Sequence, residues 1–441
     1  MPKIFHVPGL DNTLKLLREG YPFLQRRHER YDTDLFRMRL MGQEVICMHG
    51  PEAAQLLYDP KRFTRLGAVP RRVQTTLMGK DAIQTLDNGE HRCRKEMFMS
   101  LMGPGSRHRL MYLLAEQWEA YALKWERTEQ VKLFSEAEEI LCRAACAWAG
   151  VPLREKEVGL RARDFGAMVD AFGGVGLRHG RGKKARNRAE KWIRGIIRDI
   201  RSGKLPVEEG MPAYAVAWYH EPDGELLSTQ MAAIELINVL RPIVAIATYI
   251  TFAALALYEY PPYRQLLRNP NEDYTELFVQ EVRRYFPFAP FLGARVREDF
   301  TWYGFPFPKG TLVLLDVYGA NHDERLWQDS NVFWPDRFRS WQGSAFDFIP
   351  QGGGDYLIGH RCAGEWITIE AMKQAVGFLN DSITFDVPIQ NLHYDLARMP
   401  TLPASGFIMT RVKRTGKSVP TTVPVPADSA PAPVSGCPFP H

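Results

Sequence analysis

Cys362 has the surroundings best suited to chemistry in this chain of 441 residues. It stands in the sequence Gly-His-Arg-Cys-Ala-Gly-Glu, residues 359–365, ahead of a helix predicted over residues 366–378. A helix N-terminus favours a thiolate, and glycines let the backbone approach a flat cofactor closely. A thiolate is one of the few axial ligands of haem iron, although a lone cysteine is often only a small buried hydrophobe. His360 and Arg361 could neutralise carboxylates at the edge of such a cofactor.

Three charged residues ahead of this loop need one another if they are buried. Glu281 and Arg284, at positions i and i+3, share a helix face and can pair. Arg337 lies between Pro and Phe in the aromatic stretch 333–338, so we expect it to be partly buried and to need an acidic partner. In this order, the trio and the Cys362 loop resemble the cytochrome P450 superfamily, where the trio forms a buried ion-pair network that holds the haem-binding core.

The resemblance implies a mainly α protein with small β-sheets, the cytochrome P450 haem-thiolate fold, with haem b as cofactor and Cys362 as metal ligand. The commonest superfamily loop has Phe seven residues before the cysteine and Arg two before it. This chain has Asp355 and His360 there, which points to a distinct branch. Five basic residues are expected to bind the haem propionates: His91, Lys95, Arg65, His360 and Arg361. An exposed basic helix face is the alternative for His91 and Lys95.

Arg241 is the one positive charge in the middle of an apolar helix predicted over residues 229–258. Because an uncompensated buried charge is costly, it must have a partner or face a polar cavity. Glu235 is six residues away, on roughly the opposite face, and Asn238 is on the right face but carries no charge. A distant acid remains an alternative. Pro242 removes a backbone donor and is expected to kink the helix.

Arg241 and Pro242, together with the stretches 284–293 and 349–354, resemble the fatty-acid peroxygenase family over roughly residues 1–413. Ordinary superfamily monooxygenases have an acid and a threonine at this place, which deliver protons. The resemblance implies that Arg241 binds a long-chain fatty-acid carboxylate and that Pro242 opens space beside it. The carboxylate then serves as general acid–base for hydrogen peroxide, and the α or β carbon is hydroxylated without an obligatory redox partner.

Gln84 bears on the products, because hydroxylating family members have Gln at the matching position and decarboxylating members tend to have His. Hydroxylation with minor decarboxylation to a terminal alkene is therefore predicted, while a solvated loop amide is the alternative. Six residues are candidates for the acyl pocket, with plain core as the alternative: Met78, Val169, Phe172, Phe288, Ala289 and Phe291.

Two other functions stay open at this point. A conventional monooxygenase would need a ferredoxin or flavodoxin partner, whereas turnover with peroxide alone would exclude that need. A non-catalytic haem-binding or fatty-acid-binding protein would form no product.

Composition predicts one large domain over residues 1–413, followed by a disordered Pro-rich tail, residues 414–441. The longest charge-free apolar stretch, residues 242–258, falls short of the roughly 20 residues of a membrane span. With no signal peptide and no disulfide-framework spacing among six cysteines, we expect a cytoplasmic protein. The net charge of +5 gathers in an amphipathic helix near residues 178–204, read as a solvated face or a surface that steers anionic fatty acids. No base-reading module accompanies it, so nucleic-acid binding is not expected.

Overall fold

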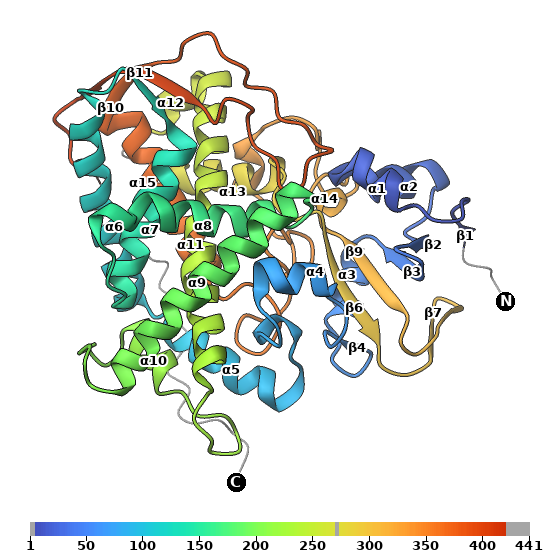
Figure 1. Ribbon diagram of the computed structural model, residues 1–441. Helices are drawn as coiled ribbons and strands as arrows, with labels where there is room; N and C mark the ends of the chain where they lie inside the picture. Colours follow the sequence, from blue (N-terminus) through green and yellow to red (C-terminus); the bar gives the residue numbers. More distant parts are fainter. Residues whose placement is uncertain (1–4, 270–272, 420–441) are drawn as a thin grey trace.

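The protein combines a large helical body with a smaller β region at one end (Figure 1). The computed structural model describes residues 5–269 and 273–419. The longer helices are α5 (Asn88–Ser100), α6 (Pro104–Trp125), α7 (Leu133–Ala149), α8 (Val158–Asp170), α9 (Leu177–Arg201), α11 (Thr229–Glu259), α13 (Tyr274–Tyr285) and α15 (Glu365–Gly377). The shorter ones are α1 (Thr13–Glu19), α2 (Gln25–Tyr31), α3 (Pro51–Leu57), α4 (Arg71–Val73), α10 (Pro212–Ala217), α12 (Pro262–Leu266) and α14 (Val317–Ala320).

The main sheet has the strand order β1-β2-β3-β9-β6-β4 and joins distant parts of the chain. Its strands are β1 (Phe5–His6), β2 (Leu35–Leu40), β3 (Gln43–Met48), β4 (Phe63–Thr64), β6 (Phe291–Val296) and β9 (Leu312–Asp316). β3 runs parallel to β9, with Val45 opposite Leu312, and β9 is antiparallel to β6. Smaller sheets are formed by β10 (Ile383–Asp386), β11 (Ile408–Arg414) and β5 (Gln130–Lys132), and by β7 (Phe300–Trp302) with β8 (Phe305–Phe307).

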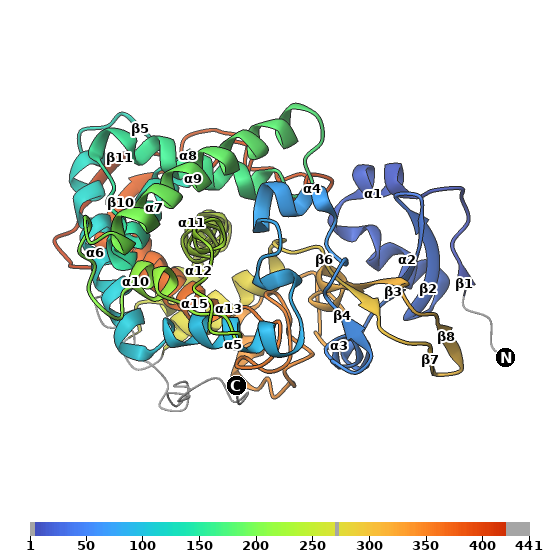
Figure 2. The ribbon, with the colours of Figure 1, turned by 60° about the horizontal axis from the view of Figure 1, so that its bottom comes forward.

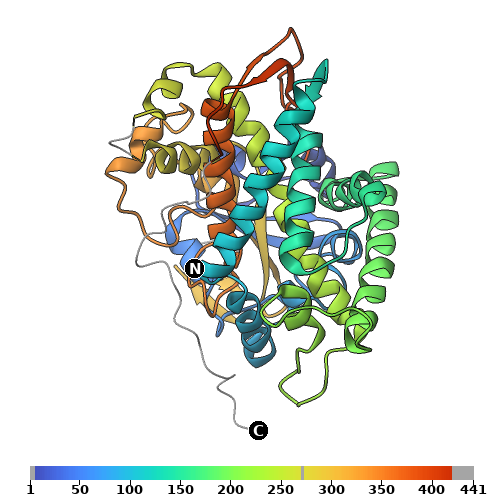
Figure 3. The same ribbon diagram turned by 90° about the vertical axis from the view of Figure 1, so that its left-hand side faces the viewer.

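Helix α11 is the axis of the helical body. Seen end-on in Figure 2, it is enclosed by other helices, and it packs on α7, α8, α9, α13 and α15. Its apolar side chains are buried all round, as the nearly continuous apolar sequence predicts. In Figure 3, α15 runs beside α6 on the opposite side of the body from the charged α9. The predicted mainly α architecture with small sheets is confirmed.

Helix α11 is long and apolar enough to cross a membrane, but 94% of its apolar window is buried inside the protein. This burial is typical of a core helix rather than of a span. Packed residues continue beyond the predicted domain boundary at 413, because β11 ends at Arg414 and Val419 is buried. Most of the predicted tail, residues 420–441, lies outside the described residues. Cys93 is in a disulfide, although the spacing of the cysteines predicts no disulfide framework.

Candidate active site

Arg241 lies in the middle of α11, a helix that is capped at its N-terminus and remains unbroken past this residue. The Ser228 hydroxyl caps it by accepting a hydrogen bond from the Met231 amide at 3.1 Å. The helix stays continuous through Pro242 for 31 residues. Because α11 is buried on all sides, Arg241 lies in the protein interior and is only 8% exposed.

The Arg241 guanidinium has almost no hydrogen-bond partner in the part of the chain that the structure describes. Its Nη2 atom donates to Asn238 Oδ1 at 3.5 Å, the outer limit of a hydrogen bond, and its Nε atom has no acceptor. No acidic side chain of residues 5–269 or 273–419 forms an ion pair with it. Burial, reinforced by the positive charge of Arg186, lowers the pKa of Arg241 to about 9. A buried cation with open donors is a site for an anionic ligand.

Glu235 is held away from Arg241, as its position on the helix predicts. Its carboxylate accepts hydrogen bonds from Arg94 at 3.0 Å and from the Ile83 amide at 2.9 Å. The Asn238 amide bridges the two, because its Nδ2 atom donates to Glu235 at 3.0 Å while its Oδ1 faces Arg241. The bond to Ile83 also fixes the turn that carries Gln84, whose buried Oε1 atom has no partner.

Arg186, on α9, is a second buried cation that the sequence did not reveal. The basic helix was expected to have a solvated face, yet Arg186 is only 1% exposed. It donates to Glu190 at 2.6 Å and to the Leu77 carbonyl at 3.0 Å, and its Nη2 atom has no acceptor. Gly79 makes room for it, because a Cβ atom there would lie 2.5 Å from Nη2. The expectation that the basic residues of α9 form a solvated face is therefore wrong at Arg186.

Cys362 is held in its loop by Gln351 and by the start of α15. The Cys362 amide donates to the Gln351 carbonyl at 3.1 Å, and the Gln351 side-chain amide lies 3.7 Å from the sulfur. Burial raises the pKa of the Cys362 thiol, while Lys95 and the Gly364 amide act in the opposite direction. The other free thiols among the described residues, Cys47, Cys142 and Cys146, are fully enclosed by apolar core.

The predicted charged trio forms one buried network. Arg284 makes a bidentate pair with Glu281 at 2.7 and 2.8 Å, and Arg337 Nε lies 3.2 Å from the same carboxylate. Arg284 also donates to the carbonyls of Asn321 and Ser330, both at 2.8 Å. Two arginines share one glutamate, and backbone carbonyls accept hydrogen bonds from their other N–H groups. The network therefore joins α13 to the segment around residues 321–337.

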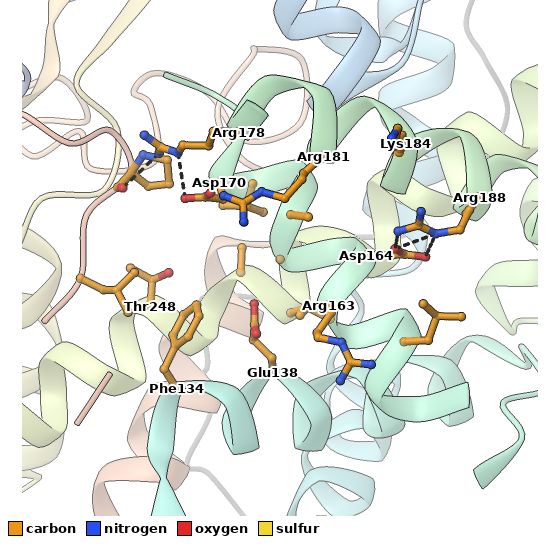
Figure 4. A pocket seen from close by; sticks show the side chains of 18 of the residues that line it. Phe134, Glu138, Arg163, Asp164, Asp170, Arg178, Arg181, Lys184, Arg188 and Thr248 are labelled. Carbon is orange, nitrogen blue, oxygen red and sulfur yellow. Dashed lines mark hydrogen bonds and ion pairs between the residues drawn. The ribbon is translucent and has the colours of Figure 1, made fainter. Parts of the chain in front are cut away.

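A cavity of about 550 Å³ opens beside α11, one to two turns from Arg241 (Figure 4). Val244, Ala245 and Thr248 line it from α11, and Val169 is the predicted acyl-pocket residue that lines it too. The other five predicted acyl-pocket residues are partly buried elsewhere. Cations surround the opening: Arg163, Arg178, Arg181, Lys184, Arg188 and Arg398.

The Glu138 carboxyl reaches into the same cavity from α7 (Figure 4). Burial, together with the negative charge of the nearby Asp170, raises its pKa to about 8. A Cβ atom on Gly166 would lie 2.0 Å from Glu138 Oε1, so the absence of a side chain there makes room for the acid. The cavity therefore has an apolar wall, a largely neutral buried acid and a basic rim.

The comparisons with known proteins agree with this arrangement. The Cytochrome P450 family model matches residues 270–380. The structure of cytochrome P450EX alpha (CYP152N1) with myristic acid has a TM-score of 0.90 and 42% identity, covering 93% of this chain and 99% of that one. The chain belongs to the CYP152 family of cytochromes P450.

A structure of cytochrome P450 OleT with arachidonic acid matches this CYP152 chain with a TM-score of 0.91 and 37% identity over 94% of this chain and 99% of that one. Curated relatives match over a shorter region. Corytuberine synthase of Coptis japonica is 31% identical over 132 residues, 29% of this chain and 26% of the relative. The chain thus spans only about a quarter of that relative's length.

Haem b with a cysteine thiolate ligand is the cofactor of this CYP152 protein, and an edge of basic residues fits its two carboxylates. Arg65, His91 and His360 line a second cavity of about 770 Å³. The rings of His91 and His360 lie 3.9 Å apart. Burial and neighbouring cations lower the pKa of His91 to about 3 and that of His360 to about 4. Arg65 supplies the positive charge at this cavity, and each neutral imidazole can donate one hydrogen bond to an anionic group.

The other two predicted propionate partners are placed differently. The Lys95 ammonium donates to the Arg361 carbonyl of the cysteine loop, and burial lowers the pKa of Lys95 to about 8. The Arg361 guanidinium turns to Glu365 at 2.7 Å and stacks over Tyr356 at 3.8 Å. Arg361 therefore already has its counter-ion, and both residues brace the loop that carries Cys362.

Proposed function

We propose that this CYP152 protein is a peroxygenase that hydroxylates long-chain fatty acids at the α or β carbon with hydrogen peroxide. The observation that carries the proposal is the buried Arg241 guanidinium, which has open donors and no acidic partner among the described residues. The relatives solved with myristic and arachidonic acids support a fatty acid as the anion. The adjoining apolar wall of Val244 and Ala245 suits an acyl chain.

Arg241 binds the substrate carboxylate through two parallel charge-assisted hydrogen bonds. Pro242 has no backbone N–H, so one hydrogen bond of α11 is missing there, and this is proposed to make space beside Arg241. No carboxylic acid among residues 5–269 and 273–419 pairs with Arg241, so the substrate carboxylate itself moves the proton between the two peroxide oxygens. Because the carboxylate is anchored, the carbons next to it are the ones presented for reaction. Bound haem supplies the iron that activates the peroxide and oxidises the C–H bond.

Cys362 is the proposed thiolate ligand of that haem, and Arg65, His91 and His360 are its proposed propionate partners. Gln84 is proposed to favour hydroxy acids over the terminal alkene. No redox partner is required in this mechanism, and a cytoplasmic, membrane-free location is part of the same proposal.

The test is product analysis by mass spectrometry after incubation of the holoenzyme with a panel of saturated fatty acids and hydrogen peroxide, without reductase or NAD(P)H. Hydroxy acids from the free acids, and none from the methyl esters, are expected. A short acid such as acetate should restore peroxide-driven oxidation of styrene by supplying the missing carboxylate. Equal rates with methyl esters and free acids would show that the substrate carboxylate takes no part. Turnover that needs a ferredoxin or flavodoxin would identify a conventional monooxygenase.

A further inference from the structure

Two histidines and an aspartate meet in the β region, far from Arg241 in the sequence. His28 lies on α2, His49 follows β3 directly, and Asp316 ends β9 and caps α14. All three are buried: the exposed fractions are 5%, 6% and 0%. Their potential ligand atoms all lie within 4.8 Å of one another. Nothing in the proposed oxidation of fatty acids uses them.

Among the described residues, one polar atom of each side chain has no hydrogen-bond partner, and those of His49 and Asp316 lie 3.5 Å apart. The three atoms are His28 Nε2, His49 Nδ1 and Asp316 Oδ2. Buried polar atoms in native proteins are nearly always satisfied, so an orphaned atom needs an explanation. Three orphaned atoms at one point, all of them electron-pair donors in the right protonation state, have a common explanation in a bound cation.

The remaining polar atoms of the cluster are already engaged. His28 Nδ1 lies 2.7 Å from the Thr33 carbonyl, which fixes the tautomer that leaves Nε2 with a free lone pair. His49 Nε2 lies 2.9 Å from Asp323, a carboxylate that Arg325 neutralises at 2.8 Å. Metal-binding histidines show this arrangement, in which the second ring nitrogen donates to a carbonyl or carboxylate that orients the ring. Asp316 Oδ1 accepts from the Gly319 amide at 2.8 Å, which leaves Oδ2 for the site.

The spacing also suits a small transition-metal ion. Zinc–nitrogen and zinc–oxygen bonds of about 2.0–2.2 Å in a tetrahedron place ligand atoms roughly 3.3–3.6 Å apart. His49 Nδ1 and Asp316 Oδ2 are 3.5 Å apart. His28 needs only a small movement, because its ligand atom lies within 4.8 Å of those of the other two residues.

The alternative is an ion pair without metal, in which His49 is an imidazolium between Asp316 and Asp323. Those carboxylates do raise the pKa of His49, to about 9, against the effect of burial. However, 3.5 Å separates Nδ1 from Asp316 Oδ2, and the pair makes no hydrogen bond. The ion pair also leaves His28 Nε2 unexplained, because that buried atom has no hydrogen-bond partner among the described residues.

We propose that His28, His49 and Asp316 bind one structural zinc ion, with a water molecule as the fourth ligand. Two imidazoles and one carboxylate are a ligand set that zinc accepts. The low exposure of all three residues excludes access by a bulky substrate. The ion would tie α2 and the end of β3 to the start of α14, which comes much later in the sequence.

Metal analysis of the haem-loaded protein, purified without a metal-affinity tag and dialysed against a weak chelator, tests the site. One zinc per chain is expected, counted separately from haem iron, together with an anomalous diffraction peak at the zinc edge between the three ligand atoms. Zinc should be lost in His28→Gln and in His49→Gln. A strong chelator should lower the unfolding temperature of the wild type and leave that of folded variants unchanged.

His322→Gln is the matched control, because His322 is equally buried nearby but both its ring nitrogens lie within 3.1 Å of backbone carbonyls. It should keep the zinc. Wild-type protein that has no zinc and takes up none from added zinc chloride would overturn the proposal and leave the ion pair. Zinc that persists in both histidine variants, or another metal at the peak, would overturn it as well. The diffraction experiment needs only wild-type protein, so a variant that fails to fold does not leave the question open.

Discussion

Arg241→Met separates a ligand-binding arginine from a structural one, because the two roles predict opposite effects. The guanidinium has one weak contact, at 3.5 Å to Asn238, and no ion pair with the described residues. Replacing an unpaired buried charge with an apolar side chain is expected to leave the free energy of unfolding unchanged or to increase it. Removing one member of a buried pair would instead cost about 3–5 kcal/mol.

Fatty-acid binding should respond strongly to the same change. Loss of a charge-assisted pair that leaves its partner buried costs roughly 2–5 kcal/mol, which corresponds to about a 30- to 5,000-fold higher dissociation constant. Displacement of a fluorescent fatty acid measures this affinity, and chemical denaturation of the ligand-free protein measures stability. Arg198→Met, on the exposed face of α9, is the control and should alter neither quantity.

The result that would refute the reasoning is a loss of about 3–5 kcal/mol in stability with unchanged fatty-acid affinity, since that is the signature of a buried pair. Arg241→Lys should recover only part of the affinity, because a point charge cannot bind both carboxylate oxygens in one plane.

Three further predictions concern other residues. Cys362→Ala should lose the red-shifted Soret band of the ferrous carbonyl complex, whereas Cys47→Ala should keep it; a normal band in the folded wild type would contradict thiolate ligation. Gas chromatography should find more hydroxy acid than terminal alkene in the wild type, and Gln84→His should raise the alkene share; an unchanged ratio would remove Gln84 from product control. Glu138 has a pKa raised from 4.5 to about 8 in the folded protein, so its contribution to stability is full below about pH 4.5 and is lost as the pH rises towards 8. Glu138→Gln should flatten the dependence of the free energy of unfolding on pH over that range. Urea unfolding at several pH values measures it, and the same pH dependence in the variant and the wild type would contradict the shift.

Sequence patterns predicted the parts of this protein that depend on local order. The helical period placed Arg241 in the interior and Glu235 on another face, and the structure has both there. The trio of Glu281, Arg284 and Arg337 was predictable because buried charges need partners.

Features that depend on contacts between distant segments were not predictable from those patterns. Arg186 sits among many exposed basic residues of α9, and only the close approach of Gly79 shows that it is buried. His28 and His49 lie on separate elements, and their spacing matches no metal-binding motif. The 550 Å³ cavity draws on five segments, so five of the six residues predicted from the family resemblance to line an acyl pocket fall outside it.

The strand order of the main sheet has a consequence for how the chain is made. Residues 43–48 can pair with their parallel neighbour only after residues 312–315 have been synthesised. The backbone at Gly20 lies so close to Leu396 and Ala397 that a Cβ atom there would be 1.9 Å from the Leu396 carbonyl oxygen. The first strands must therefore wait on the ribosome with an apolar edge unpaired, which exposes them to aggregation. A lower expression temperature or added chaperone should therefore raise the yield of this protein more than that of a chain whose early strands need no partner from later in the sequence.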